Sequence, residues 1–245
     1  MKIGLLGYGR MGREVEAVAI ERGHTISARF ISTHQVPDDT SLTGELAGVD
    51  CLVDFSVPTA APRHIRIFGS LPVPLVVGTT GWHDQIPALT DLVRHRGGAL
   101  LYASNFSIGA QIFFTAVSAA AKLIDRFPEY DIAIQETHHA LKKDAPSGTA
   151  LTLARSILDT VKRKTSILTS LDGHQAEPHE LVVSSTRVGS VTGTHSVLFD
   201  SPVDSIQLIH TAHNRRGFAL GAVYAAEWLV GRRGVFTMED FLFPK

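Results

Sequence analysis

The sequence has little of what marks a disulfide-stabilised, membrane-spanning or nucleic-acid-binding protein. It contains one cysteine among 245 residues, which excludes a disulfide within the chain and favours a reducing compartment. No apolar stretch approaches the roughly 20 residues of a membrane helix, and no run of like charge is long enough for a nucleic-acid-binding arm. The opening MKIGLLGYGR breaks at glycines, so we expect a buried strand there rather than a signal peptide. We therefore expect a cytoplasmic protein that binds a small molecule, and neither nucleic acid nor membrane.

The chain has enough apolar sequence for one large domain or two modest ones. Hydrophobic residues make up 44%, and 23 Lys+Arg nearly balance 24 Asp+Glu. In the first hundred or so residues, β-branched runs alternate with amphipathic stretches, which is typical of βα units on a parallel sheet. We expect strands at residues 2–6, 25–31, 51–55, 75–77 and 99–103, and helices at residues 11–22, 59–68 and 84–96.

The pattern changes after a long alanine-rich helix that is expected from residue 108 to about 126. Strand-like segments follow at residues 130–137, 180–188, 194–200 and 205–211. The last three succeed one another without helices, which indicates an antiparallel or mixed sheet. A helical pattern returns at residues 217–230.

A glycine motif, Gly7-Tyr8-Gly9-Arg10-Met11-Gly12, lies directly between the first strand and the first helix. In this context Gly7 permits a tight turn, Gly9 lets the backbone approach a pyrophosphate, and Gly12 allows close packing of helix on strand. The motif predicts a dinucleotide site. The expected fold class is therefore α/β, with an N-terminal Rossmann doubly wound parallel sheet and a second α+β domain with a mixed or antiparallel sheet. We expect a dinucleotide-binding domain at residues 1–106 and 217–245, and a substrate-binding domain at residues 107–216.

Two further loops follow strands at the same expected edge of the sheet, Gly78-Thr79-Thr80-Gly81 and Ala103-Ser104-Asn105-Phe106. Ligands of open α/β sheets bind at the carboxyl ends of the strands, so these loops are expected to line the nicotinamide half of the cofactor site.

The acidic residue that usually binds the adenosine ribose is missing after the second strand. Ser32 and Thr33 occupy that place, Asp38 and Asp39 lie several residues further on, and Arg29 lies within the strand. Without a carboxylate to repel a 2′-phosphate, the sequence favours NADPH slightly over NADH.

The most informative segment runs from residue 136 to 150, ETHHALKKDAPSGTA. Ser147 is a suitable N-cap, so Gly148 and Thr149 would offer N–H groups at a helix start that suits a carboxylate. His138 and His139 bring two imidazoles, which transfer protons near neutral pH. Adjacent residues of an extended chain point in different directions, and we expect no metal site, because we identify no carboxylate or cysteine ligand beside the two histidines.

These motifs together resemble the dihydrodipicolinate reductase (4-hydroxy-tetrahydrodipicolinate reductase) family over nearly the whole chain. The resemblance covers GYGRMG, GTTG, ASNFSIG, ExHHxxKxDxPSGTA, RVGSVTGTH and FALGAV, of which the reactive segment is the most specific. It implies an NAD(P)H-dependent oxidoreductase that reduces 4-hydroxy-tetrahydrodipicolinate, a dicarboxylate, in lysine biosynthesis. It also implies a homotetramer assembled through the sheet of the second domain.

The resemblance also implies roles for individual residues. His138 is the expected proton donor or acceptor and Lys142 the second donor, while His139, Gly148 and Thr149 contact the substrate carboxylates. The implied cofactor contacts are Gly7, Tyr8, Gly9, Arg10, Met11, Gly12, Gly78, Thr79, Thr80, Ala103, Ser104, Asn105 and Phe106.

Three features depart from the family pattern. The chain is shorter between the second and third strands, it lacks the acidic residue after the second strand, and Ala140-Leu141 replaces a more basic pair. The first two concern cofactor preference and the third concerns substrate affinity.

Two other classes of protein would share parts of this pattern. A nucleotide-sensing protein would bind the cofactor without turnover, but it would not need the His-His-x-x-Lys segment. A dehydrogenase of aspartate or aspartate semialdehyde would often need a reactive cysteine in the second domain, whereas Cys51 lies in an apolar run of the first.

Overall fold

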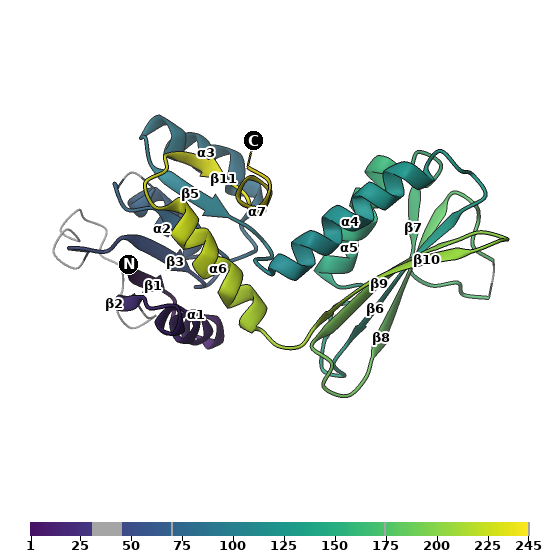
Figure 1. Ribbon diagram of the computed structural model, residues 1–245, viewed down its shortest axis with the longest axis horizontal. Coiled ribbons are helices and arrows are strands. Elements are labelled where there is room, and N and C mark those ends of the chain that lie inside the picture. The colour runs from purple at the N-terminus through teal and green to yellow at the C-terminus, as the bar shows by residue number, and fades with distance from the viewer. Residues whose placement is uncertain (31–45, 70, 174, 245) are drawn as a thin grey trace. The chain divides into compact units, whose positions relative to one another are not determined.

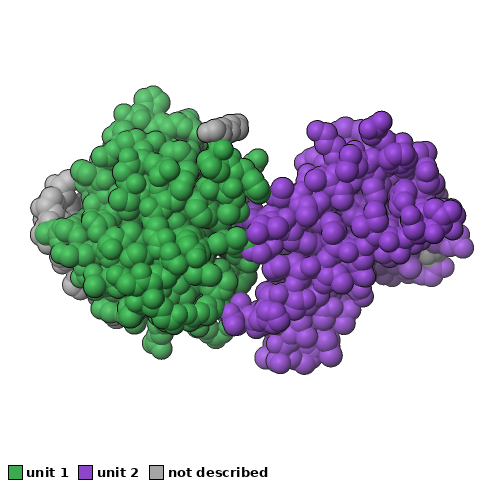
Figure 2. Space-filling model, viewed as in Figure 1, with its two compact units in different colours: residues 1–108, 215–245 green, residues 109–214 purple. Residues whose placement is uncertain are grey.

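The structure is a computed structural model, and it describes residues 1–30, 46–69, 71–173 and 175–244. The chain divides into two compact units, which Figure 2 colours separately. Unit 1 comprises residues 1–108 and 215–245, and unit 2 comprises residues 109–214. Among the helices of the described residues, none is both long and apolar enough to cross a membrane.

Unit 1 is built on a six-stranded sheet in the order β11-β5-β4-β3-β1-β2, in which every neighbouring pair is parallel. Its strands are β1 (Lys2–Leu6), β2 (Thr25–Phe30), β3 (Cys51–Asp54), β4 (Leu75–Val77), β5 (Ala99–Tyr102) and β11 (Gly234–Phe236). Its helices are α1 (Arg10–Glu21), α2 (Ala61–Phe68), α3 (Ile86–His95), α6 (Arg216–Leu229) and α7 (Met238–Leu242), with a 3-10 turn at His83–Gln85.

Both faces of this sheet are covered by helices, as Figure 1 shows. Consecutive strand residues point to opposite faces, so Leu5 belongs to the core beneath α1 and α6, whereas Leu6 belongs to the core beneath α2 and α3. This explains why the central strands β3, β4 and β5 are buried nearly throughout, whereas the edge strand β2 alternates. Because the strands are parallel, the loops that follow β1, β3, β4 and β5 leave the same edge of the sheet.

Unit 2 has a five-stranded mixed sheet in the order β10-β9-β6-β8-β7. Strand β6 pairs antiparallel with β9 and parallel with β8. The strands are β6 (Asp131–His138), β7 (Ser166–Leu168), β8 (Glu180–Arg187), β9 (Gly193–Asp200) and β10 (Ser205–Ala212). The helices are α4 (Ile108–Ile124), which begins at the boundary between the units, and α5 (Gly148–Thr160).

The two helices cover one face of this sheet (Figure 1), and the core lies between them and residues such as Ile134, Val183 and Val197. On the other face, apolar residues such as Leu198 and Ile209 are exposed. One face of the sheet in unit 2 is therefore available to solvent or to a partner.

The expected fold class is confirmed: one unit has a parallel, doubly wound sheet and the other has a mixed sheet with helices. The expected helix start is also confirmed, because the Ser147 hydroxyl accepts a hydrogen bond from the Ala150 N–H. Strands β7 and β11 and helix α7 were not predicted from the sequence. Ile31, the last residue of the expected second strand, lies outside the described residues.

Candidate active site

Glycine is required at two positions in the loop between β1 and α1. Gly7 has a φ of 88°, and a Cβ there would lie 2.6 Å from the carbonyl oxygen of Phe55. A Cβ on Gly12 would lie 2.3 Å from the carbonyl oxygen of Gly7. Gly9 differs: it is the N-cap of α1, and among the described residues nothing lies within 4 Å of the place its Cβ would take. The first N–H groups of α1 are thus open to approach, which fits the pyrophosphate of a dinucleotide.

A buried carboxylate organises the next loop along this edge. Asp54, at the end of β3, is fully buried; its Oδ1 accepts a hydrogen bond from the Thr79 hydroxyl (2.9 Å), and its Oδ2 lies 2.7 Å from Nδ1 of His64. Gly78 packs on the Phe55 ring, and a Cβ on Gly78 would lie 2.1 Å from Cε1 of Phe55. No role was assigned to Asp54 or Phe55 from the sequence. An acid within the apolar run CLVDF could have indicated Asp54, because a buried carboxylate needs partners.

The loop after β5 meets the same group. The Phe106 ring is buried and makes an edge-on contact with the Phe55 ring at 6.0 Å between centroids. The Asn105 side chain accepts a hydrogen bond from the Ser107 N–H at 2.8 Å. The backbone N–H of Ala103 donates to Val77 at the end of β4. The structure therefore brings the three expected cofactor segments to one edge of the sheet, where Arg10, Thr80 and Ser104 are exposed and Tyr8 and Met11 are half-buried.

Tyr8 is tied to the second strand through Glu16 on α1. The Tyr8 hydroxyl and the Arg29 guanidinium both donate to the Glu16 carboxylate, and the hydrogen bond from Arg29 lowers the pKa of that carboxyl. The Arg29 guanidinium lies 5.6 Å from the centre of the Tyr8 ring. Arg29 thus extends towards α1. The other residues weighed for ribose recognition, Ser32, Thr33, Asp38 and Asp39, lie outside the described residues.

In unit 2 the reactive segment connects β6 to α5. His138 is the last residue of β6, and Gly148 and Thr149 form the first turn of α5. Gly148 is exposed and Thr149 is half-exposed, and no described atom lies within 4 Å of the place a Cβ on Gly148 would take. The N-terminus of α5 is therefore accessible, as a carboxylate-binding helix start must be.

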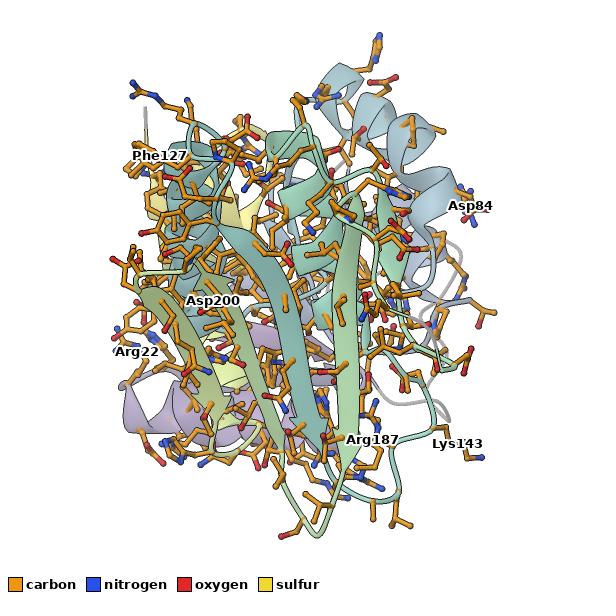
Figure 3. All side chains as sticks on the ribbon, turned by 90° about the vertical axis from the view of Figure 1, so that its right-hand side faces the viewer. Arg22, Asp84, Phe127, Lys143, Arg187 and Asp200 are labelled. Atoms are coloured by element: carbon orange, nitrogen blue, oxygen red, sulfur yellow. The ribbon has the colours of Figure 1, made fainter. Side chains whose placement is uncertain are left out.

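His138 is buried beside a buried acid. Its Nδ1 is in ion-pair contact with Oε2 of Glu136, and Oε1 of Glu136 accepts a hydrogen bond from Arg187 at 2.7 Å. Arg187 also donates to the carbonyl of Asp144 at 2.6 Å, so it ties the loop to the end of β8. Figure 3 labels Arg187 at this end of β8 and Lys143 on the adjacent loop. Burial lowers the pKa of His138, and Glu136 only partly counteracts this.

A second buried histidine completes the cluster. His195 comes from β9, where it pairs with Glu136 across the strands, and its ring meets the His138 ring edge-on at 5.1 Å. Its Nε2 lies 3.2 Å from the Ser147 hydroxyl, which caps α5. Burial lowers the pKa of His195 to about 4. Neither Arg187 nor His195 was singled out from the sequence, because strand pairing brings them to the segment from about 50 residues away.

The remaining expected residues lie on the loop itself. Lys142 Nζ contacts both carboxylate oxygens of Asp144 at 2.8 Å, and the hydrogen bond from Lys142 lowers the pKa of Asp144. His139 is half-buried, in contrast to the buried His138. The positive charge of Lys142 also contributes to the lowered pKa of His138, so the expected proton-transfer groups interact electrostatically.

Two expectations about reactive groups can be compared with the structure. A carboxylate does lie beside the histidines, contrary to the sequence argument: possible ligand atoms of Glu136, His138 and His195 lie within 4.8 Å of one another. Both Glu136 oxygens already contact protein groups, Arg187 at Oε1 and His138 at Oε2, and we assign no metal to this group. Cys51 is fully buried in β3, and burial raises the pKa of its thiol, so it is not suited to act as a nucleophile.

The parallel sheet with its glycine loop, together with the His-Lys segment of unit 2, defines a pyridine-nucleotide-dependent oxidoreductase. Family models described as "Dihydrodipicolinate reductase, N-terminus" and "Dihydrodipicolinate reductase, C-terminus" match residues 1–106 and 109–242. The chain belongs to the dihydrodipicolinate reductase family, as its motifs indicated.

Individual relatives agree with this. The 4-hydroxy-tetrahydrodipicolinate reductase of Christiangramia forsetii is 39% identical over 245 residues, covering 99% of this chain and 98% of the relative. The enzyme of the same name from Natronomonas pharaonis is 38% identical over 239 residues, covering 95% and 96%. Dipicolinate-bound dihydrodipicolinate reductase from Paenisporosarcina sp. TG-14 is 22% identical and superimposes with a TM-score of 0.76 over 97% of both chains, so it shares the fold.

Proposed function

We propose that this chain reduces 4-hydroxy-tetrahydrodipicolinate to tetrahydrodipicolinate with NADPH or NADH in diaminopimelate and lysine biosynthesis. Loss of water from this cyclic imine gives a conjugated C=C–C=N system, to which a hydride and a proton are then added. The proposal rests on one observation: in this member of the family, the segment from Glu136 to Thr149 places several reactive and anion-binding groups together. It joins a buried histidine, a lysine and an accessible helix start.

The substrate is a dicarboxylate, and unit 2 offers groups that bind carboxylates. The N–H groups of Gly148 and Thr149 and the Thr149 hydroxyl lie at the N-terminus of α5, where the helix dipole favours an anion. His139 and Lys142 add donors from the preceding loop. Lys142 is paired with Asp144, and we expect a substrate carboxylate to compete with Asp144 for the ammonium group. We therefore assign substrate binding and oligomerisation to unit 2.

Bound NADPH or NADH supplies the hydride. The chain must supply the proton and hold it close to the acceptor atom. His138 and Lys142 are the groups that we assign to this step, with His138 as proton donor or acceptor and Lys142 as second donor. Burial around His138 also excludes water from the transfer.

Cofactor binding is assigned to unit 1. Its contacts are proposed to be the glycine loop from Gly7 to Gly12, Gly78 to Thr80, and Ala103 to Phe106, which share one sheet edge. NADPH is slightly favoured over NADH because the sequence has no acid directly after the second strand, where a carboxylate would repel a 2′-phosphate.

The exposed face of the sheet in unit 2 is the proposed surface for a homotetramer. Leu198 and Ile209 are exposed on it, and the residues opposite them on neighbouring strands are small or polar: Ala133, Ser196 and Gln207. Light scattering of the purified chain tests the oligomer: a monomer at micromolar concentration would contradict it.

The single buried cysteine and the biosynthetic role favour the cytoplasm.

The function is tested by a coupled assay in which the unstable substrate is generated freshly and NADPH or NADH is supplied separately. We expect substrate-dependent oxidation of the reduced nucleotide, with a higher kcat/KM for NADPH. A folded protein that binds nucleotide but shows no substrate-dependent oxidation would contradict the proposed reaction. A higher kcat/KM with NADH would overturn only the cofactor preference.

A further inference from the structure

Glu136 is the common partner of the groups that surround His138. It lies two residues before His138 on β6 and hence on the same face of the sheet. Its Oε1 accepts hydrogen bonds from Arg187 (2.7 Å) and from the Ser147 N–H (3.2 Å), and its Oε2 is in contact with Nδ1 of His138. Its side chain has 0% exposure. Both oxygens of this fully buried carboxylate therefore face groups of the protein, and the side chain is closed to substrate.

The surroundings keep this carboxylate ionised. Burial by itself raises the pKa of Glu136, but the hydrogen bonds from Arg187 and Ser185 are the main causes that bring the pKa below its ordinary value. An ionised carboxylate can accept hydrogen bonds and cannot donate one. A close contact between Nδ1 of His138 and an ionised carboxylate oxygen is favourable only when Nδ1 carries a hydrogen, so the geometry favours the Nδ1–H form.

The remaining sides of the His138 ring are also defined. The His195 ring from β9 meets it edge-on. Gly193, on the same strand as His195, lies close to the His138 ring. A Cβ on Gly193 would be 3.0 Å from Nε2 and 3.3 Å from Cδ2 of His138. Glycine therefore leaves space beside Nε2, the nitrogen that Glu136 does not engage. The charged groups that act on the ring from the packed elements are Glu136 on β6, Arg187 on β8 and Lys142 on the loop.

We infer that Glu136 is a positioning residue, whose carboxylate holds His138 with its hydrogen on Nδ1 and leaves Nε2 to exchange the proton with substrate. Arg187 in turn holds Glu136 and links it to the loop through the Asp144 carbonyl. This inference rests on the proposed function, in which His138 transfers a proton. Glu136 itself contacts neither substrate nor cofactor, and acts only through the orientation and basicity of His138.

Kinetics of Glu136→Gln provide the first test. The amide keeps the shape but lacks the charge, so we expect kcat to fall by about tenfold to a hundredfold while KM changes by less than about threefold. Because the Glu136 charge raises the pKa of His138, the limb of the pH profile that reports His138 should move to lower pH. Glu136→Asp keeps the charge and should recover part of kcat. Glu129→Gln, the same change at an exposed residue before β6, should behave as the wild type.

A second measurement is independent of turnover. In protein labelled with ¹⁵N-histidine, the ring resonances of His138, assigned by comparison with His138→Gln, report which nitrogen carries the hydrogen. We expect the Nδ1–H form in the wild type and a mixture of forms in Glu136→Gln. An Nε2–H form in the wild type would overturn the inference even if Glu136→Gln does not fold.

The two proposals can fail separately. If His138→Ala keeps wild-type turnover, the proposed role of His138 is wrong and the inference falls with it. If His138→Ala is inactive while folded Glu136→Gln keeps the wild-type kcat and pH profile, the proposed function stands and the positioning role of Glu136 is wrong.

Discussion

Each unit contains a fully buried carboxylate at or near the carboxyl end of a strand, and the two are held differently. Asp54 in unit 1 accepts from the Ser56 backbone and the Thr79 hydroxyl, and it pairs with His64. Glu136 in unit 2 is held by a guanidinium, that of Arg187. Neutral donors dominate around the first acid, and a full positive charge lies against the second.

The difference indicates what each acid is for. Asp54 fixes the Ser56 backbone in the loop after β3 and the Thr79 hydroxyl in the loop after β4, so its effect should be on the shape of the proposed cofactor site. Glu136 fixes a side chain that gains or loses a proton, so its charge should affect the chemical step. Substitutions at the two acids and at the residues around them distinguish these roles.

The largest effect on kcat is expected for the two residues to which proton transfer is assigned. His138→Ala and Lys142→Ala should each lower kcat by roughly a hundredfold or more, the scale for loss of a positioned proton donor. His139→Ala should instead raise KM more than it lowers kcat, because its proposed role is binding. Steady-state kinetics of the folded variants test this. Wild-type turnover in Lys142→Ala would remove that residue from the mechanism.

Acid should weaken unit 2 through its buried histidines. The pKa of His195 is lowered from an ordinary value of 6.5 to about 4, so its contribution to stability is intact above pH 6.5 and is lost as the pH falls towards 4. The loss is on the order of 3 kcal/mol. Urea unfolding followed between pH 7.5 and 4.5 should show a smaller pH dependence in His195→Gln. Equal slopes in both proteins would contradict the assignment.

The glycine loop allows the contribution of ligand binding to be separated from that of folding. Gly9→Ala places a methyl group in open space, so it should leave Tm unchanged and weaken cofactor binding by about tenfold or more, because it obstructs the approach of the pyrophosphate. Gly12→Val should abolish binding and also disturb the packing of α1 on β1, while unit 2 stays folded. Fluorescence titration of cofactor, with thermal melts as control, measures both. Unchanged affinity in Gly9→Ala would place the pyrophosphate elsewhere.

Asp54→Asn tests the contrast directly. Loss of the charge and of a matched acceptor should reduce stability by about 1–3 kcal/mol. It should also raise the KM for the cofactor several-fold, because the Thr79 loop loses its anchor. We expect the chemical step to change little. A fall in kcat as large as that expected for Glu136→Gln, at saturating cofactor, would show that the two acids do not differ in role.

The smallest effect is expected at Gly193. In Gly193→Ala the new methyl would lie 3.0 Å from Nε2 of His138, so the ring must shift by a few tenths of an ångström. A fall in kcat of about threefold to tenfold is expected, since proton transfer depends closely on distance. Gly189→Ala is a poor control because its φ is 51°, whereas Ser190→Ala changes an exposed side chain in the same connection. Equal kcat in Gly193→Ala and wild type would indicate that Nε2 is not the reacting atom.

Most of the fold followed from the sequence because its long elements carry clear periodicity. The three-residue strands β7 and β11 are too short to show any period. Helix α7 had a readable signal, since Thr237 and Asp240 form a capping box, but it spans only five residues.

The candidate site was predictable where it is continuous in sequence. His138, Lys142 and the cap at Ser147 lie on one segment, so local spacing was sufficient. Arg187 and His195 lay within the motif RVGSVTGTH, yet nothing local shows that they meet Glu136. That depends on which strands pair and how they are aligned, a long-range property that periodicity does not encode.

The pairing of β9 with β6 also limits which changes of length the chain can accept. Glu136 stands opposite His195, and consecutive residues of a strand face opposite sides. A slip of β9 by one residue would turn His195 onto the solvent-facing side of the sheet and bring a side chain up against His138 in place of Gly193. An insertion between β8 and β9 is therefore compatible with the site only if it lengthens the connection at residues 188–192 and leaves the register of β9 against β6 unchanged.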